Sequence, residues 1–92
     1  MAGTDAVPRL TLLARAYCHL CDDMREGLRR LAAGHDVVVD ELDVDAFPAL
    51  EARFGELVPV LFAGPVEEGR ELCHYFLDET RVLAVITGGG AG

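Results

Sequence analysis

The chain contains no tryptophan, only 7% of its residues are aromatic, and basic side chains are scarce. Eight basic residues stand against sixteen acidic ones, so the formal net charge of the 92-residue chain is -8. Nucleic-acid binding needs a basic surface, and anionic membranes attract basic segments. The charge balance therefore argues against both kinds of partner, although it says little about the fold.

Long apolar runs and dense cysteines are also missing. No apolar stretch approaches the length of a bilayer, and residues 1–8 lack the basic region and apolar core of a signal peptide. The three cysteines form an odd and sparse set, unlike the disulfide framework of a small secreted domain. These absences favour a soluble protein of the reducing cytoplasm.

The length allows one domain with one modest core. We expect an N-terminal extension over residues 1–8, a domain over 9–87 and a disordered glycine-rich tail over 88–92. There is no internal repeat and no linker. We expect a monomer.

Two cysteines with motif spacing are the main chemical feature of the chain. Cys18-His19-Leu20-Cys21 follows a short apolar run and begins a helical pattern of apolar residues. The unpaired backbone N–H groups of a helix N-terminus stabilise a thiolate, and a second thiol one turn away can resolve a mixed disulfide. The pattern predicts dithiol redox chemistry, with metal binding as the competing interpretation.

The apolar patterns predict an alternation of strands and helices. Strands are expected over 10–14, 37–42, 58–62 and 70–75, and helices over 19–33 and 46–54 and after Asp78. The order β-α-β-α-β-β-α makes the first two strands parallel and the last two antiparallel. The result is an α/β fold with a mixed four-stranded sheet and helices on both faces.

The short second helix has recognisable end signals. Asp45 is expected to cap it and Gly55 to end it. Its apolar residues Phe47, Leu50 and Phe54 are expected to face the core.

In this arrangement the chain resembles the small bacterial glutaredoxin-like proteins of the thioredoxin superfamily. The resemblance depends on Cys18-x-x-Cys21 between the first strand and helix, Val58-Pro59 opening the third strand, and Asp78 after the fourth. It implies a thioredoxin-like fold in which Pro59 is cis beside the dithiol. It also implies that the backbone of Val58 pairs with a bound thiol substrate.

The resemblance also bears on glutathione, which would be a co-substrate and not a bound cofactor. Arg15 matches a basic residue that meets a glutathione carboxylate in the family, and Asp78 matches the acid that meets its amine. However, His74 and Tyr75 occupy the positions of a glycine pair against which glutathione lies, and Leu57 replaces the usual threonine. The glutathione site is therefore half preserved.

Cys18, at the predicted helix N-terminus, is the expected nucleophile, and Cys21 is the expected resolving thiol. Such a position lowers the pKa of a cysteine from about 8.5 to about 3.5–7.5. Asp22 and Asp23 oppose this effect, while Arg15 and a protonated His19 would support it, so we expect a moderate lowering.

The neighbours of the motif have two interpretations each. His19 would stabilise the thiolate or relay a proton, or would simply be an exposed polar residue. Tyr17 is expected to shield the dithiol on one side, with ordinary partial burial as the alternative.

The remaining candidate ligands are expected to be inert. Cys73 lies among apolar strand residues, which favours a buried unreactive thiol, and its neighbour His74 should point to the opposite face. His35 is expected in solvent. The acidic residues between 36 and 51 lack the spacing of a calcium loop and indicate a solvated face. No metal site is predicted.

Three functions remain open from the sequence. The first is an enzyme that reduces a disulfide-containing protein or a glutathione adduct and is itself reduced by glutathione or a thioredoxin system. The second is a metal or iron–sulfur module that completes its ligands across a dimer or with glutathione. The third is a non-catalytic interaction domain that retains the thioredoxin fold.

Overall fold

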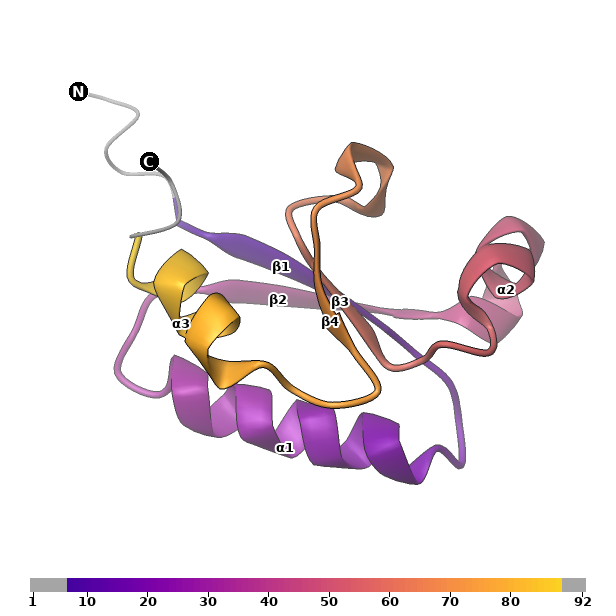
Figure 1. The fold of residues 1–92 in the computed structure, drawn as a ribbon, viewed down its shortest axis with the longest axis horizontal. Helices are drawn as coiled ribbons and strands as arrows, with labels where there is room; N and C mark the ends of the chain where they lie inside the picture. Colours follow the sequence, from indigo (N-terminus) through magenta and orange to yellow (C-terminus); the bar gives the residue numbers. More distant parts are fainter. Residues whose placement is uncertain (1–6, 89–92) are drawn as a thin grey trace.

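The computed structural model describes residues 7–88, which form a sheet with three α-helices (Figure 1). The strands are β1 (Arg9–Ala14), β2 (Val38–Asp43), β3 (Val60–Ala63) and β4 (Glu71–His74). The helices are α1 (His19–Ala32), α2 (Pro48–Phe54) and α3 (Glu79–Ile86), and two 3₁₀ turns, η2 (Val44–Ala46) and η3 (Val66–Glu68), lie between them. Both the predicted element order and the α/β fold class are confirmed.

The four strands form one mixed sheet with the spatial order β2-β1-β3-β4. β1 and β2 are parallel, as the helical connection through α1 predicts, and β3 and β4 are antiparallel. β1 also pairs antiparallel with β3, and these two central strands carry most of the buried residues of the sheet. β4 lies at one edge of the sheet, beside β3.

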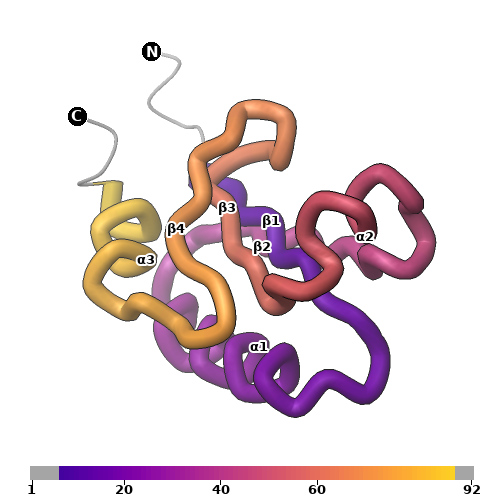
Figure 2. Tube along the Cα trace, turned by 45° about the vertical axis from the view of Figure 1, so that its right-hand side comes forward, coloured from indigo at the N-terminus to yellow at the C-terminus, as the bar shows by residue number. Residues whose placement is uncertain are grey.

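Each face of the sheet has its own apolar cluster. On one face Leu12, Leu61 and Leu72 pack with Met24 of α1 and Val82 of α3. The other face presents side chains that include Leu13, Val60 and Phe62, and these pack with Val44 of η2 and Phe54 of α2. The predicted helices on both faces are therefore present, and Figure 2 shows α2 well apart from α1 and α3.

The strand register brings three segments to one end of the sheet. Leu13, near the end of β1, pairs with Val60, the first residue of β3, and Val60 pairs with His74, the last residue of β4. The loop after β1, the loop before β3 and the loop after β4 therefore meet. This is the end that carries the Cys18–Cys21 motif.

The second helix differs from the prediction. Residues Val44–Ala46 form a 3₁₀ turn whose N-cap is Asp43, and α2 starts separately at Pro48. Asp45 therefore does not cap the helix. Its backbone N–H donates a hydrogen bond to the carboxylate of Asp43, which caps the 3₁₀ turn. The side chain of Asp45 instead binds Arg15. Gly55 ends the helix as expected.

The predicted burial of Phe47 is also wrong. It is the N-cap of α2 and its side chain is 45% exposed, whereas Leu50 is half-buried and Phe54 is buried. Because the 3₁₀ turn shifts the start of α2, the three aromatic and aliphatic residues do not share one buried stripe. The third strand likewise begins at Val60, so Val58 and Pro59 precede it.

The predicted extension and tail lie largely outside the described residues, which omit 1–6 and 89–92. Within residues 7–88, no helix has the length and apolar character needed to cross a membrane.

Candidate functional site

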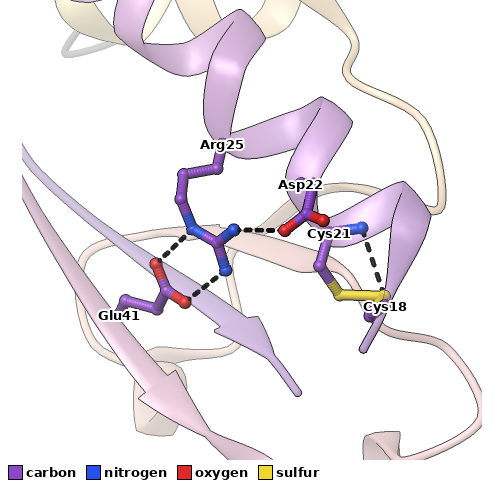
Figure 3. The surroundings of a disulfide bond; sticks show 5 residues. All are labelled: Cys18, Cys21, Asp22, Arg25 and Glu41. Carbon is purple, nitrogen blue, oxygen red and sulfur yellow. Dashed lines mark hydrogen bonds and ion pairs between the residues drawn. A yellow bond between two sulfur atoms is a disulfide. The ribbon is translucent and has the colours of Figure 1, made fainter. Parts of the chain in front are cut away.

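Cys18 and Cys21 form a disulfide at the N-terminus of α1, with their Cα atoms 5.1 Å apart. Cys18 is the N-cap residue, and its sulfur accepts a hydrogen bond of 3.1 Å from the backbone N–H of Cys21 (Figure 3). Cys21 is fully buried against the core, while Cys18 is partly accessible. The pair can therefore cycle between disulfide and dithiol, and the outer sulfur has a hydrogen-bond donor ready for a thiolate.

The Val58–Pro59 peptide bond is cis, in agreement with the expectation from the resemblance. Pro59 is buried, and its carbonyl accepts a hydrogen bond of 2.9 Å from the backbone N–H of Tyr75. Val58 packs against the apolar clusters on both faces of the sheet. Cys18 packs against the cluster that contains Met24 and Val82. Among residues 7–88, neither the N–H nor the C=O of Val58 makes a backbone hydrogen bond, so both can face a ligand.

Arg15 lies in the same loop as the cysteines, but acidic side chains already bind it. Its guanidinium contacts Asp45 at 2.9 Å and Glu51 at 3.4 Å. The Nε atom of Arg15 is buried without a hydrogen-bond partner in the described part of the chain. A carboxylate from a ligand would have to compete with two carboxylates of the protein.

Arg25 of α1 lies near the disulfide in Figure 3 and was not among the site residues predicted from the sequence. It makes a two-point contact with Glu41 of β2, at 2.9 and 2.6 Å, and a third hydrogen bond of 2.7 Å with Asp22. The hydrogen bonds to Glu41 raise the pKa of the Arg25 guanidinium, so it stays charged. The spacing of Asp22 and Arg25 signalled a helical ion pair. The contact with Glu41 depends on strand pairing and has no local signal.

The two residues that flank Cys18 face solvent. His19 is exposed, with its Nε2 atom 3.8 Å from Asp23, which agrees with its interpretation as an exposed polar residue. Tyr17 is fully exposed and has a positive φ of 57°. The expected shielding of the dithiol by Tyr17 is therefore wrong, because the side chain is fully exposed and does not cover a neighbour.

Asp78 caps α3, as predicted, through a hydrogen bond of 3.1 Å from the backbone N–H of Arg81. The third cysteine, Cys73 of β4, is half-buried and is not part of a disulfide. Burial raises the pKa of the Cys73 thiol; the backbone N–H of Asp78 lowers this pKa through a hydrogen bond, and the negative charge of the Asp78 carboxylate raises it again. His74 is exposed and contacts Glu71 at 2.6 Å. Over residues 7–88, no three His, Cys, Asp or Glu side chains gather as a metal site would require.

Known proteins share both the sequence and the fold. The family model of the glutaredoxin-like domain (DUF836) matches residues 9–87. An uncharacterized protein of Mycobacterium tuberculosis is 36% identical over 84 residues, which cover 86% of this chain and 82% of that protein.

Solved structures agree with this assignment. Protein Ne2328 of Nitrosomonas europaea is 34% identical, with a TM-score of 0.69 over 92% of both chains. The X. campestris protein XcR50 is 37% identical, with a TM-score of 0.66 over 86% of this chain and 96% of its own. A mutant thioredoxin of Halobacterium salinarum has a TM-score of 0.56 at 26% identity, over 94% of this chain and 77% of its own.

The family-model match spans almost the whole described chain, including both motif cysteines and Pro59, and the solved structures share its fold. With its disulfide-bonded pair at a helix N-terminus, the chain belongs to the glutaredoxin-like family within the thioredoxin fold.

Proposed function

We propose that this protein is a thiol–disulfide oxidoreductase that uses the Cys18–Cys21 dithiol to reduce protein or glutathione mixed disulfides. The observation that supports it most is the asymmetry of the pair. Cys18 is partly accessible, and its sulfur accepts a hydrogen bond from the backbone N–H of Cys21, whereas the Cys21 side chain is fully buried. An attacking thiol must be reachable and stabilised as thiolate, and a resolving thiol needs only to reach the first sulfur.

The reaction transfers two electrons to the substrate. The Cys18 thiolate attacks one sulfur of the substrate disulfide, forms a mixed disulfide and releases the first substrate thiolate. Cys21, as thiolate, then attacks the Cys18 sulfur and releases the second substrate thiolate, which leaves the Cys18–Cys21 disulfide. An external thiol reductant, glutathione or a thioredoxin system, returns the pair to the dithiol.

Other residues would position the substrate. The free backbone of Val58, before cis-Pro59, is well placed to pair with the backbone of a bound thiol compound. In the glutathione reaction, Asp78 would receive the amine, and Arg15 would receive a carboxylate only by releasing Asp45 or Glu51. Tyr17 and His19 would border the substrate from the solvent side. We expect the reaction to take place in the cytoplasm, where thiols are kept reduced.

Reduction of insulin disulfides by the protein, in the presence of dithiothreitol, tests the proposal. We expect Cys18→Ser to reduce the rate to the uncatalysed background and Cys73→Ser, the matched control, to leave it unchanged. Full activity of the Cys18→Ser protein would end the proposal. A wild-type protein that cycles between disulfide and dithiol without accelerating the reaction would indicate an interaction domain instead.

A further inference from the structure

Two arginines, Arg15 in the loop before the motif and Arg25 of α1, are each bound by more negative charge than they carry. Arg15 contacts Asp45 and Glu51, and Arg25 contacts Glu41 and Asp22. Each positive charge therefore meets two carboxylates. These two arginines and the four carboxylates that contact them therefore sum to a net negative charge.

Two further acids at this end of the sheet add to that negative charge. Asp23 is exposed near the N-terminus of α1, and within residues 7–88 its ion-pair partner is His19, whose Nε2 atom is 3.8 Å away. Glu56 is exposed in the loop before Val58 and takes part in no ion pair within residues 7–88. A ligand rich in carboxylates, such as glutathione, would approach this surface against an unfavourable field.

Three exposed aromatic side chains lie in the loops at the end of the sheet that carries the disulfide. Tyr17 is fully exposed, Phe76 is 69% exposed and Tyr75 is 37% exposed. We call these three residues the aromatic rim. Tyr17 directly precedes Cys18, and the other two follow β4, the strand whose end meets the loop of Pro59. Exposed aromatic side chains around a reactive centre are typical of protein–protein contact surfaces.

The backbone at two of the three rim residues has a conformation that large residues avoid. Tyr17 and Tyr75, with φ of 57° and 64°, are the non-glycine residues of the described chain that have a positive φ. This conformation is uncommon for bulky side chains and costs free energy that glycine would not lose. Both positions therefore carry tyrosine although their backbone conformation favours glycine.

Tyr75 is fixed from both of its ends. Its N–H donates to the carbonyl of Pro59, and its hydroxyl donates to the carbonyl of Glu56, both at 2.9 Å. The ring of Phe76 lies edge-on to it, with 6.5 Å between the ring centres. The side of the cis-proline loop is thus covered by a fixed aromatic ring, which reduces the space for a small ligand and offers apolar surface to a larger one.

We propose that the aromatic rim and the acidic residues around it select a cationic protein segment, with an apolar or aromatic side chain beside its disulfide-bonded cysteine, in preference to glutathione. The inference depends on the proposed disulfide reduction and names its substrate class. The rim would contact the apolar side chain, while the unneutralised carboxylates attract basic residues of the partner. The electron transfer is the one described above, with the partner protein as oxidant.

Single-turnover reaction of the reduced protein with small disulfides tests this inference without a second reductant. The substrates are three disulfide-linked peptide dimers and glutathione disulfide. The first peptide has Phe beside Cys and two Lys residues, the second replaces Lys by Glu, and the third replaces Phe by Ser. Acid quenching, alkylation and mass spectrometry follow the formation of the Cys18–Cys21 disulfide.

We expect the Lys–Phe peptide to react about tenfold faster than the Glu–Phe peptide at low salt, which is the lower end of electrostatic steering. The difference should shrink at about 1 M salt, where the Debye length falls to about 3 Å. Glutathione disulfide and the Lys–Ser peptide should both be slower than the Lys–Phe peptide. Equal rates for the Lys–Phe and Glu–Phe peptides, or an equal rate for glutathione disulfide, would overturn the inference.

Matched variants separate the charge from the rim. Asp23→Lys should reduce the preference for the Lys–Phe peptide, whereas Glu67→Lys, the same charge change on η3 between the far ends of β3 and β4, should not. Tyr75→Gly should speed the reaction with glutathione disulfide and slow that with the Lys–Phe peptide. Tyr17→Ser, at a fully exposed side chain, should lower the preference for Phe over Ser without affecting folding.

Variants that leave every ratio unchanged would refute the inference. If the reduced wild-type protein forms no Cys18–Cys21 disulfide with any of the four substrates, the proposed function itself fails. The two failures are therefore distinguishable.

Discussion

The two cysteine environments of this protein have the same thiol group and opposite surroundings. Cys18 is the N-cap of α1, and its sulfur accepts a backbone N–H. Cys73 is half-buried in an edge strand beside the N-terminus of α3, where the cap is the carboxylate of Asp78. A helix terminus capped by sulfur stabilises a thiolate, whereas one capped by a carboxylate places a negative charge near the neighbouring thiol. For Cys73, burial raises the pKa of the thiol most, the backbone N–H of Asp78 lowers it, and the charge of Asp78 raises it. The comparison teaches that a helix N-terminus favours a thiolate at an accessible N-cap, whereas at the half-buried Cys73 burial outweighs the backbone donor.

The largest effect should come from removal of the resolving thiol. In Cys21→Ser, we expect the mixed disulfide between Cys18 and a substrate protein to accumulate to one adduct per protein, because the second attack cannot occur. Mass spectrometry under non-reducing conditions measures the adduct. Cys73→Ser should accumulate none. An adduct on Cys73 in the Cys21→Ser protein would break the comparison.

Alkylation of the fully reduced protein should show the next largest difference. At pH 7 we expect iodoacetamide to modify Cys18 faster than Cys73 by about tenfold or more, given the thiolate stabilisation at a helix N-terminus. Burial raises the pKa of Cys73, so its modification should increase only as the pH rises above the usual thiol range. Peptide mass spectrometry over a pH series follows both residues. Equal rates at pH 7 in the folded protein would contradict this prediction, and in denaturant the difference should disappear.

Asp78 should connect the stability of α3 to the reactivity of Cys73. Loss of the cap in Asp78→Ala should lower the free energy of unfolding by about 1 kcal/mol, as for other N-cap residues. Asp78→Asn keeps a capping group and removes the charge, so stability should change less while the pKa of Cys73 falls. Urea unfolding and Cys73 alkylation measure the two effects, with Thr80→Ala as the control. An unchanged Cys73 rate in Asp78→Asn would exclude the charge effect.

The smallest effect concerns the ion pairs on the dithiol side. Arg25→Gln removes the contacts with Glu41 and Asp22 and should lower the free energy of unfolding by about 0.5 kcal/mol, because the pair is partly exposed. Arg29→Gln, which loses a contact within α1 to Glu26, is the control and should cost less. The difference should decrease at high salt. A larger loss of unfolding free energy for Arg29→Gln than for Arg25→Gln would show that the contact between Arg25 and Glu41 of β2 does not add to stability.

Most of the fold could be predicted because its signals are local. Apolar periodicity, β-branched runs and glycine positions defined the strands and the long helix. The boundaries around 44–48 could not be predicted in this way. Asp43 and Asp45 are equivalent as capping residues in the sequence, and the choice between them depends on the chain direction after β2 and on the pairing of Asp45 with Arg15.

The sequence alone determined the reactive pair of this protein, because the spacing of Cys18 and Cys21 at a helix start is a local property. It also determined the order of strands and helices and the cap at Asp78. Only the tertiary structure decided what surrounds the pair. Two carboxylates hold Arg15, Glu41 of β2 holds Arg25, and the Tyr75 hydroxyl reaches Glu56 across the loops. These contacts join residues distant in the chain, so they depend on strand register and backbone direction, which residue spacing does not contain.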